Sequence, residues 1–214
     1  MKVAIVGITA PTNGTTPEQF LVDCARVSNP NAVPGEGSPR LLAYMVEHAH
    51  WSPFEMVSIT MEIHTTRDIS RQILRHRSFS FQEFSQRYAE TPCDMVAREC
   101  RLQHPTNRQD SIANEDAERL QRGFTEAQRD VWDLATSAYH AALAQGIAKE
   151  QARALLPEGL TATRLYMAGT LRSWMHYCDL RGGNGTQREH MAIAKAARDE
   201  LAPHFPSIFT GETA

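Results

Sequence analysis

Apolar and polar positions repeat at two different periods in the middle of the chain. From Val57 to His64, apolar residues alternate with polar ones, and this period of two is typical of a half-buried strand. The period then changes, because Ile69, Ile73 and Leu74 are spaced for one face of a helix. The residues after Leu74 therefore fall at a helix C-terminal end, where positively charged side chains are favoured.

The N-terminal residues predict a strand and then a helix. Met1 to Gly7 is a short, mostly apolar run, which we interpret as a buried first strand. Thr16 and Pro17 have the pattern of a helix N-cap followed by the first helical residue. The glycines between these elements lack the GxGxxG spacing and Pro11 interrupts them, which disfavours a dinucleotide-binding fold.

The second half of the chain is dominated by helical patterns. Residues 114–145 predict a long helix, ended by Gly146, whose apolar residues step by four and three and form a seam for packing on another helix. The seam residues are Leu120, Phe124, Ala127, Val131, Leu134, Ala138 and Ala141. The partner helix can belong to the same chain or to a second subunit. We also expect helices at 151–155 and 161–180, and a last helix that starts at Thr186 with a capping box.

Together these elements predict one α+β domain over residues 1–214. We expect an antiparallel sheet flanked by several helices, including the long one. A chain of 214 residues is long enough to bury most of its apolar surface in one core. Oligomerisation is therefore not forced by the size of the chain.

Composition favours a cytoplasmic protein without a general affinity for nucleic acid. The net charge of -3 and the pI near 6.3 argue against such binding, which usually shows as a basic domain. The four cysteines form no CxxC pair, so neither a metal site nor a disulfide framework is indicated. No apolar run reaches the ~18 residues that span a bilayer, and the opening run is too short for a signal peptide.

The highest density of anion-binding groups lies between Arg75 and Arg87. This segment carries three arginines, a histidine, a glutamate and three serines. The planar guanidinium group suits bidentate contacts with phosphate or carboxylate groups. The segment therefore predicts a site for a phosphorylated ligand.

Two other classes of protein share parts of this pattern. A nucleic-acid-binding module would use the arginines and the three phenylalanines of the segment as phosphate and base contacts, but it leaves Ser52, Arg153 and Arg181 unexplained. A helical carboxylate metalloprotein would use Glu47 and His50, which have the spacing of metal ligands. That pattern occurs once, whereas a di-iron bundle needs two.

The spacing within the segment matches a family signature. Arg-His-Arg, two residues, Ser, two residues, Glu, one residue, Ser, one residue and Arg fixes seven positions, and it resembles the signature of the flavin-dependent thymidylate synthases. Further elements follow in the family's order and at about its distances: Ala25-Arg26-Val27-Ser28, His50-Trp51-Ser52-Pro53-Phe54-Glu55, Ala152-Arg153-x-x-Leu156-Pro157, and Leu180-Arg181 followed by Gln187-x-Glu189. The resemblance spans roughly Arg26 to Glu189.

The resemblance implies a reductive methylation of dUMP to dTMP. Methylenetetrahydrofolate would give the carbon and end as tetrahydrofolate, FAD would carry the hydride, and NADPH would be the reductant. It also implies a homotetramer with active sites at subunit contacts. A uracil ring is a poor nucleophile at C5, and a guanidinium that stabilises negative charge at N3 and O4 raises the electron density there. Arg181 has the position of the family arginine with this role, so we expect it to be the catalytic residue.

The other site residues are carried over by position. The nucleotide would be lined by Gln72, Arg75, Glu83, Phe84, Ser85, Gln86, Arg87, Arg153 and Arg181. The FAD would be faced by Ser52, Arg75, His76, Arg77, Glu83, Thr170, Leu171, Arg172 and His176. His50 and Tyr88 are weaker candidates for the folate or nicotinamide side, because a ring near the flavin suits stacking, and core packing is the alternative for each.

Three positions depart from the family pattern. Gln82 stands where Asn is common, Thr170 stands where Asn often contacts the flavin, and Gly185 replaces a common His. No cysteine lies in a matching motif, so the cysteine nucleophile of the other thymidylate synthase class is absent. Ser85 is the one hydroxyl placed to be a covalent nucleophile, with Glu83 as the nearest base, and we interpret it as a dUMP ligand instead.

Overall fold

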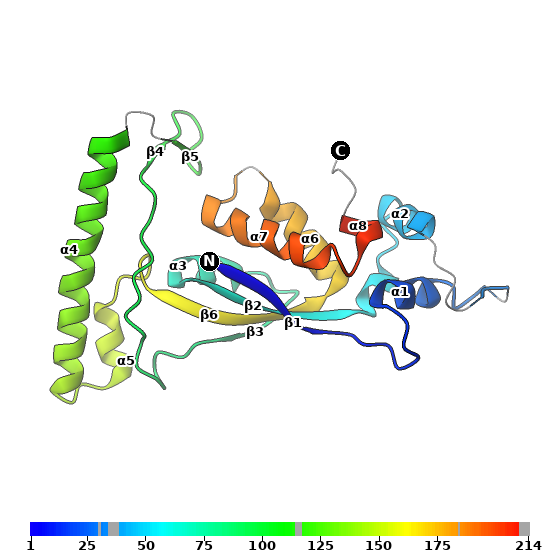
Figure 1. Ribbon diagram of the computed structural model, residues 1–214, viewed down its shortest axis with the longest axis horizontal. Helices are drawn as coiled ribbons and strands as arrows, with labels where there is room; N and C mark the ends of the chain where they lie inside the picture. Colours follow the sequence, from blue (N-terminus) through cyan, green and yellow to red (C-terminus); the bar gives the residue numbers. More distant parts are fainter. Residues whose placement is uncertain (30, 34–38, 114–116, 184, 210–214) are drawn as a thin grey trace.

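A four-stranded antiparallel sheet forms the centre of the fold (Figure 1). The computed structural model describes residues 1–29, 31–33, 39–113, 117–183 and 185–209. The strands lie in the order β1-β2-β6-β3, and their bounds are Lys2–Ile8 for β1, Ser58–Thr66 for β2, Ala162–Thr170 for β6 and Ser80–Glu83 for β3. The alternating pattern that predicted a strand at 57–64 is confirmed in β2.

The sheet has one face in the core and one polar face. Ile59, Met61 and Ile63 of β2 are fully buried, whereas Thr60 and Glu62, which alternate with them, are partly exposed. This is the expected outcome of the period of two, because successive side chains of a strand point to opposite faces. The buried face receives the helices.

The first strand is less buried than its sequence predicts. β1 is an edge strand that pairs only with β2 among the described strands, and its Val6 is 54% exposed. The prediction of a buried strand was wrong because an apolar run shows that a strand can be buried, whereas its place in the sheet decides whether it is.

The segment 161–180, predicted as helical throughout, is a strand followed by a helix. β6 occupies Ala162–Thr170, and α6 occupies Leu171–Gly182. Leu165 and Met167 face the core, and Arg164 and Tyr166 alternate with them. Unlike β2, β6 contains an unbroken apolar run from Leu165 to Ala168, which periodicity alone does not distinguish from a helix. Thr170 marks the boundary, because its Oγ1 caps α6 by accepting a hydrogen bond from the Ser173 N–H.

Most of the helices pack around the sheet. Their bounds are Pro17–Ala25 for α1, Pro39–Glu47 for α2, Arg67–Ile73 for α3, Arg188–Leu201 for α7 and Pro206–Phe209 for α8, with a 3-10 turn, η1, at Ser52–Glu55. Figure 1 shows α6 and α7 side by side over one face of the sheet. Trp174 and Tyr177 of α6 and Ile193 and Leu201 of α7 belong to the main core.

Two predicted helix starts have different outcomes. Thr16 caps α1, because its Oγ1 accepts from the Gln19 N–H at 3.1 Å, and this prediction is confirmed. The last helix begins later than predicted, with Gln187 at the N-cap and no capping hydrogen bond from its side chain. The capping box at Thr186 was therefore wrong, although a helix does follow.

The long helix α4 lies at the other end of the molecule from α1 and α2 (Figure 1). It spans Ala117–Ala144, and the predicted residues 114–116 lie outside the described part. Tyr139 and Ala142 form a small second core with Ala152 and Leu156. These last two residues come from α5 (Lys149–Ala152) and from the turn that follows the 3-10 helix η2 (Arg153–Leu155).

A short hairpin and the absence of a spanning helix complete the fold. β4 (Arg101–Gln103) pairs with β5 (Ser111–Ala113) in a separate two-stranded sheet. None of the helices that the structure describes is long and apolar enough to cross a bilayer. The predicted α+β class, with an antiparallel sheet flanked by helices that include a long one, is confirmed. The prediction of one domain over 1–214 extends to residues 210–214, which lie outside the described residues.

Candidate active site

The Arg75–Arg87 segment is held on the sheet by the ring of Phe79. This ring packs edge-on against Trp174, with centroids 4.9 Å apart, and lies so close to Gly169 that a Cβ there would approach the ring to 2.5 Å. Ser173 Oγ also donates a hydrogen bond to the Ser78 carbonyl at 3.3 Å. Only glycine fits opposite this ring, and the packing leaves Arg75 and Arg77, on either side of His76, exposed.

Arg181 and His76 are brought together from positions 105 residues apart. Arg181 Nε donates a hydrogen bond to His76 Nε2 at 3.0 Å. Burial and then the Arg181 charge lower the pKa of His76, so the ring stays neutral and keeps the lone pair that accepts this bond. Tyr177 packs edge-on against His76 at 5.0 Å between centroids. The guanidinium of the predicted catalytic arginine is therefore oriented by the chain itself.

Gln72 lies beside this pair and contacts α7. Its Nε2 donates to Gln187 Oε1 at 2.7 Å, and its Oε1 lies 3.4 Å from His190 Nδ1. His190 is fully buried, and burial, with Arg181 and His76 nearby, lowers its pKa to about 4. Gln72 and Arg181, predicted from separate motifs, thus meet in one partly buried cluster.

His190 is a site residue that the sequence reasoning missed. It follows directly after the Gln187-x-Glu189 element, so its position was within reach, but no local pattern distinguishes a buried histidine from an exposed one. Its Nε2 and the hydroxyl of Tyr177 are buried without a hydrogen-bond partner. Such atoms are costly unless something outside the described residues satisfies them.

The predicted flavin residues at the start of α6 form a second group. Arg172 pairs with Glu55 at 2.8 Å, and hydrogen bonds from Thr170 and then Arg172 lower the pKa of Glu55. His176 packs against Trp51 with centroids 4.6 Å apart. Thr170 caps the helix as Asn also can, so this departure from the family pattern preserves the cap.

Two other predicted flavin residues differ in their exposure to solvent. Ser52 begins η1 and is exposed. Leu171 is fully buried in the core, and its backbone N–H donates to the Val57 carbonyl at 2.8 Å. The side chain of Leu171 therefore packs within the chain and offers no surface to a ligand.

A third group surrounds a cavity of about 290 Å³ between α3 and α5. It is lined by Arg67, Arg71, Gln86, Glu150, Arg153, Ala154, Leu156, Glu158 and Thr161. Arg87 Nε lies 3.1 Å from a Glu150 carboxylate oxygen, and Arg153 Nε donates to the Glu150 carbonyl at 3.3 Å. Gln86, Arg87 and Arg153, all predicted nucleotide ligands, thus gather around Glu150.

Glu83 and its neighbours lie at the end of β3. Thr163 Oγ1 donates to the Glu83 carboxylate at 3.0 Å, and Arg67 lies 3.0 Å from the same oxygen. Arg67 also donates to the Phe84 carbonyl at 3.2 Å. Ser85 is exposed. Because its carboxylate is already held by two groups, Glu83 is poorly placed to act as a base for Ser85.

The three groups are separate sets of polar contacts in the described residues. Among the described residues, no hydrogen bond or ion pair directly joins the Arg181 cluster, the Glu55–Arg172 pair and the Glu150 cavity. Neither Arg75 nor Arg77 has an acidic partner in the part of the chain that the structure describes. Two exposed guanidinium groups without such a partner fit the diphosphate of a dinucleotide cofactor. Likewise, the described residues hold no cluster of His, Cys, Asp and Glu that could bind a metal ion.

The fold is shared with a solved nucleotide methylase. The structure is similar to that of a UMP/dUMP methylase, PolB from Streptomyces cacaoi, solved with 5-Br dUMP, with a TM-score of 0.84 and 26% identity over 98% of this chain and 93% of that one. The chain belongs to the thymidylate synthase complementing protein family, Thy1, whose model matches residues 12–207.

Relatives of similar length are named for the flavin-dependent reaction. The chain is 46% identical over 213 residues to a flavin-dependent thymidylate synthase from Synechocystis sp., covering 97% of both chains. It is 42% identical over 211 residues to a probable flavin-dependent thymidylate synthase from Paramecium bursaria Chlorella virus 1, again covering 97% of both. The resemblance that the Arg75–Arg87 spacing indicated is confirmed.

Proposed function

We propose that this protein is an FAD-dependent thymidylate synthase that converts dUMP to dTMP. Methylenetetrahydrofolate supplies the carbon and ends as tetrahydrofolate, and NADPH supplies the reducing equivalents. The family membership supports the reaction. The observation that carries the mechanism is the hydrogen bond from Arg181 Nε to a neutral His76.

Arg181 activates the pyrimidine by stabilising its ionised form. Its Nε is occupied by His76, so the two terminal amino groups of the guanidinium remain for the substrate. A positive charge beside N3 and O4 favours loss of the N3 proton and raises the electron density at C5. Because His76 is neutral, it orients Arg181 without adding a second charge. The arginine is thereby set in place before the substrate arrives.

The nucleotide is held by groups from two of the three clusters. Gln72 lies next to Arg181, where it contacts the base, and Arg87 and Arg153 bind the phosphate through charged hydrogen bonds. Gln86, Phe84 and Ser85 line the path between them. Arg75 and Glu83 serve both the nucleotide and the cofactor.

FAD is held by the exposed arginines and by the start of α6. Arg75, Arg77 and Arg172 supply positive charge for its diphosphate, and Ser52, His76, Glu83, Thr170 and His176 surround the rest. When bound, the flavin supplies the hydride that the methylation needs. His50 is also exposed, and Tyr88, in the loop after the arginine segment, is 87% exposed. Both are therefore free to stack on the folate or nicotinamide.

The cysteines give no support to a covalent route. Burial raises the pKa of Cys178 to about 12, and burial also raises the pKa of Cys24 and Cys93. A thiol with a raised pKa is a poor nucleophile because little thiolate is present. Glu83, the base considered for Ser85, is held by Thr163 and Arg67, so Ser85 acts as a ligand of dUMP.

The active sites are shared between the subunits of a cytoplasmic homotetramer. The seam residues of α4 are exposed, with Leu120 at 52%, Val131 at 52% and Leu134 at 74%. An exposed apolar stripe on a long helix is a surface for another subunit. The exposed stripe supports the assembly, and the shared site rests on the family resemblance.

The function is tested first by the cofactor and then by Arg181. The purified protein is expected to be yellow, with flavin absorbance near about 450 nm, and to form dTMP from dUMP, methylenetetrahydrofolate and NADPH. Arg181→Ala should lower dTMP formation by about a hundredfold or more while the circular dichroism spectrum stays unchanged, and Arg181→Lys should recover part of the loss.

Two outcomes would contradict this proposal. A protein that gains no flavin on incubation with FAD would not be this enzyme. Ser85→Ala should retain turnover, because the serine is a ligand. Complete loss in that variant with dUMP binding preserved would instead make Ser85 the nucleophile.

A further inference from the structure

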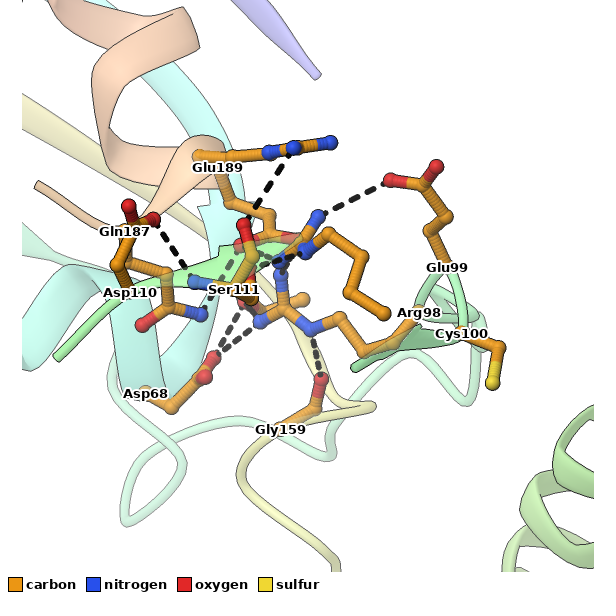
Figure 2. A network of polar contacts seen from close by, with 12 residues as sticks. Asp68, Arg98, Glu99, Cys100, Asp110, Ser111, Gly159, Gln187 and Glu189 are labelled. Carbon is orange, nitrogen blue, oxygen red and sulfur yellow. Dashed lines mark hydrogen bonds and ion pairs between the residues drawn. The ribbon is translucent and has the colours of Figure 1, made fainter. Parts of the chain in front are cut away.

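Two arginines of the segment before β5 converge on one carboxylate at the start of α7. Figure 2 shows Arg98 between Asp68 and Glu189, with its Nε directed to the Gly159 carbonyl. Arg101 Nη2 lies 2.7 Å and 2.9 Å from the two oxygens of Glu189. Burial alone would raise the pKa of Glu189, but its own backbone N–H, Arg101 and Gln187 outweigh it, and the pKa is lowered. Glu189 is therefore ionised, and Arg101 holds both of its oxygens in place.

Because Glu189 is charged, it determines which atom donates and which accepts in each hydrogen bond of the series from Gln187 through Gln72 to His190. Glu189 can only accept, so the amide it contacts at 3.0 Å must be Nε2 of Gln187. The Oε1 of Gln187 then accepts from Gln72 Nε2 at 2.7 Å. This leaves Gln72 Oε1 facing His190 Nδ1 at 3.4 Å. His190 therefore carries its proton on Nδ1 and leaves a lone pair on Nε2.

We propose that Glu189 and Gln187 are positioning residues that fix the orientation of the Gln72 amide and the tautomer of His190. An isolated glutamine can turn its amide by half a rotation and exchange its donor for its acceptor. Here the series of bonds from Glu189 allows one orientation. Gln72 keeps one N–H and one lone pair for a ligand, each in a fixed place.

The fixed amide distinguishes uracil from cytosine. This step rests on the proposed function, in which Gln72 contacts the base of dUMP. Uracil presents an acceptor oxygen at C4, and after loss of the N3 proton an acceptor at N3 as well, whereas cytosine presents an amino donor at C4. An amide held in one orientation can match only one of these edges, and the mismatched base leaves buried polar groups unpaired. An amide that is free to turn can match either.

The same contacts also tie the hairpin to the core, and two variants separate these roles. Gln187→Met breaks the series between Glu189 and Gln72 but leaves both arginine contacts with Glu189. Arg101→Met weakens the tie of the hairpin but leaves Glu189 and Gln187 in place. Arg98, which also approaches Glu189 at 3.7 Å, remains in both variants.

The test uses the full-length enzyme with its flavin. In Gln187→Met the KM for dUMP should rise about tenfold. Selectivity, measured as the inhibition constant of dCMP divided by the KM for dUMP, should fall by a similar factor. Glu189→Gln should show the same loss of selectivity. Arg101→Met should keep the selectivity and lower the melting temperature. Gln187→Met with wild-type selectivity, or a larger loss of selectivity in Arg101→Met, would overturn the proposal.

A second readout does not depend on the enzymatic reaction. Nitrogen NMR of histidine-labelled protein should show His190 protonated at Nδ1 in the wild type, and this signal should shift or become mixed in Gln187→Met. If the wild type forms no dTMP, the proposed function fails but this shift still tests the positioning. An unchanged His190 signal in Gln187→Met would overturn the positioning even in an active enzyme.

Discussion

Helices α4 and α7 carry similar apolar stripes but bury them to different extents. Ile193, Ala194, Ala197 and Leu201 of α7 are all fully buried, because the sheet and α6 cover them. In α4 the seam residues Leu120, Phe124, Val131 and Leu134 are 41–74% exposed. A helical period shows that a helix needs a partner. It does not show whether the partner is in the same chain.

The proposed site residues near α6 and α7 also differ from those near α5. On the side of α6 and α7, Arg181 is held by His76 within the chain. On the side of α5, Arg87 pairs with Glu150, and both side chains are about half exposed or more, at 70% and 47%. In the proposed enzyme, the guanidinium that activates the base is therefore held in place by the chain, whereas the proposed phosphate-binding arginine is more exposed and can rearrange when a ligand binds.

The largest predicted effect comes from placing a charge on each stripe. Leu134→Glu should give a folded protein of smaller assembly size whose dTMP formation falls about a hundredfold, because the shared site cannot form. Ala197→Glu should instead unfold the chain, since it buries a charge without a partner. Light scattering and circular dichroism measure the two outcomes.

A matched control for the α4 variant lies on another face of the same helix. Asp133→Lys also changes the charge of an exposed side chain, but it lies away from the seam and should keep the assembly and the activity. If Leu134→Glu retained both the size and the activity of the wild type, α4 would not be an interface.

Much of the fold follows from local patterns, and the failures have physical causes. β2, the cap at Thr16 and the long helix were predicted because each is specified by neighbouring residues. β6 was missed because its apolar run from Leu165 to Ala168 does not alternate and is not distinguished from a helix by periodicity. The edge position of β1 depends on which strands pair, and no local pattern records this.

The sequence yields candidate site residues but not their arrangement. The spacing of the motifs pointed to Gln72, His76 and Arg181, and the structure places them together. The contact between Arg101 and Glu189 joins residues 88 positions apart, and neither residue carries a local signal of it. Gly185 has a φ of 85°, a left-handed conformation that glycine adopts freely and histidine does not. The backbone at Gly185 thus favours glycine.

The next effect concerns His190, a buried residue of α7. Its pKa is about 4 in the folded chain and about 6.5 in the unfolded one. Below about pH 6.5 the unfolded chain binds a proton that the folded chain does not, so stability is lost as the pH falls toward about 4. The loss amounts to up to about 3 kcal/mol. Urea unfolding at pH 7.5 and 4.5 measures it.

Two histidine variants, one buried and one exposed, test this pH effect. His190→Asn removes the titrating ring, so the variant should lose less stability than the wild type between these pH values, even if it is less stable at pH 7.5. His140→Gln, which changes an exposed histidine of α4, should leave the acid dependence unchanged. Equal slopes in all three proteins would show that His190 does not control acid stability.

The smallest predicted effect concerns the carboxylate that occupies Arg87. A phosphate that binds Arg87 competes for its charge with Glu150, whose carboxylate accepts a hydrogen bond from Arg87 Nε at 3.1 Å. Glu150→Gln removes this competition, so the KM for dUMP should fall about two- to threefold, in keeping with the small free energy of exposed ion pairs. Glu158→Gln is the matched control, because Glu158 pairs with Arg71 at similar exposure, and Arg71 is not expected to bind the nucleotide. If Glu158→Gln alone lowered the KM, the phosphate would lie at Arg71, on the α3 side of the cavity.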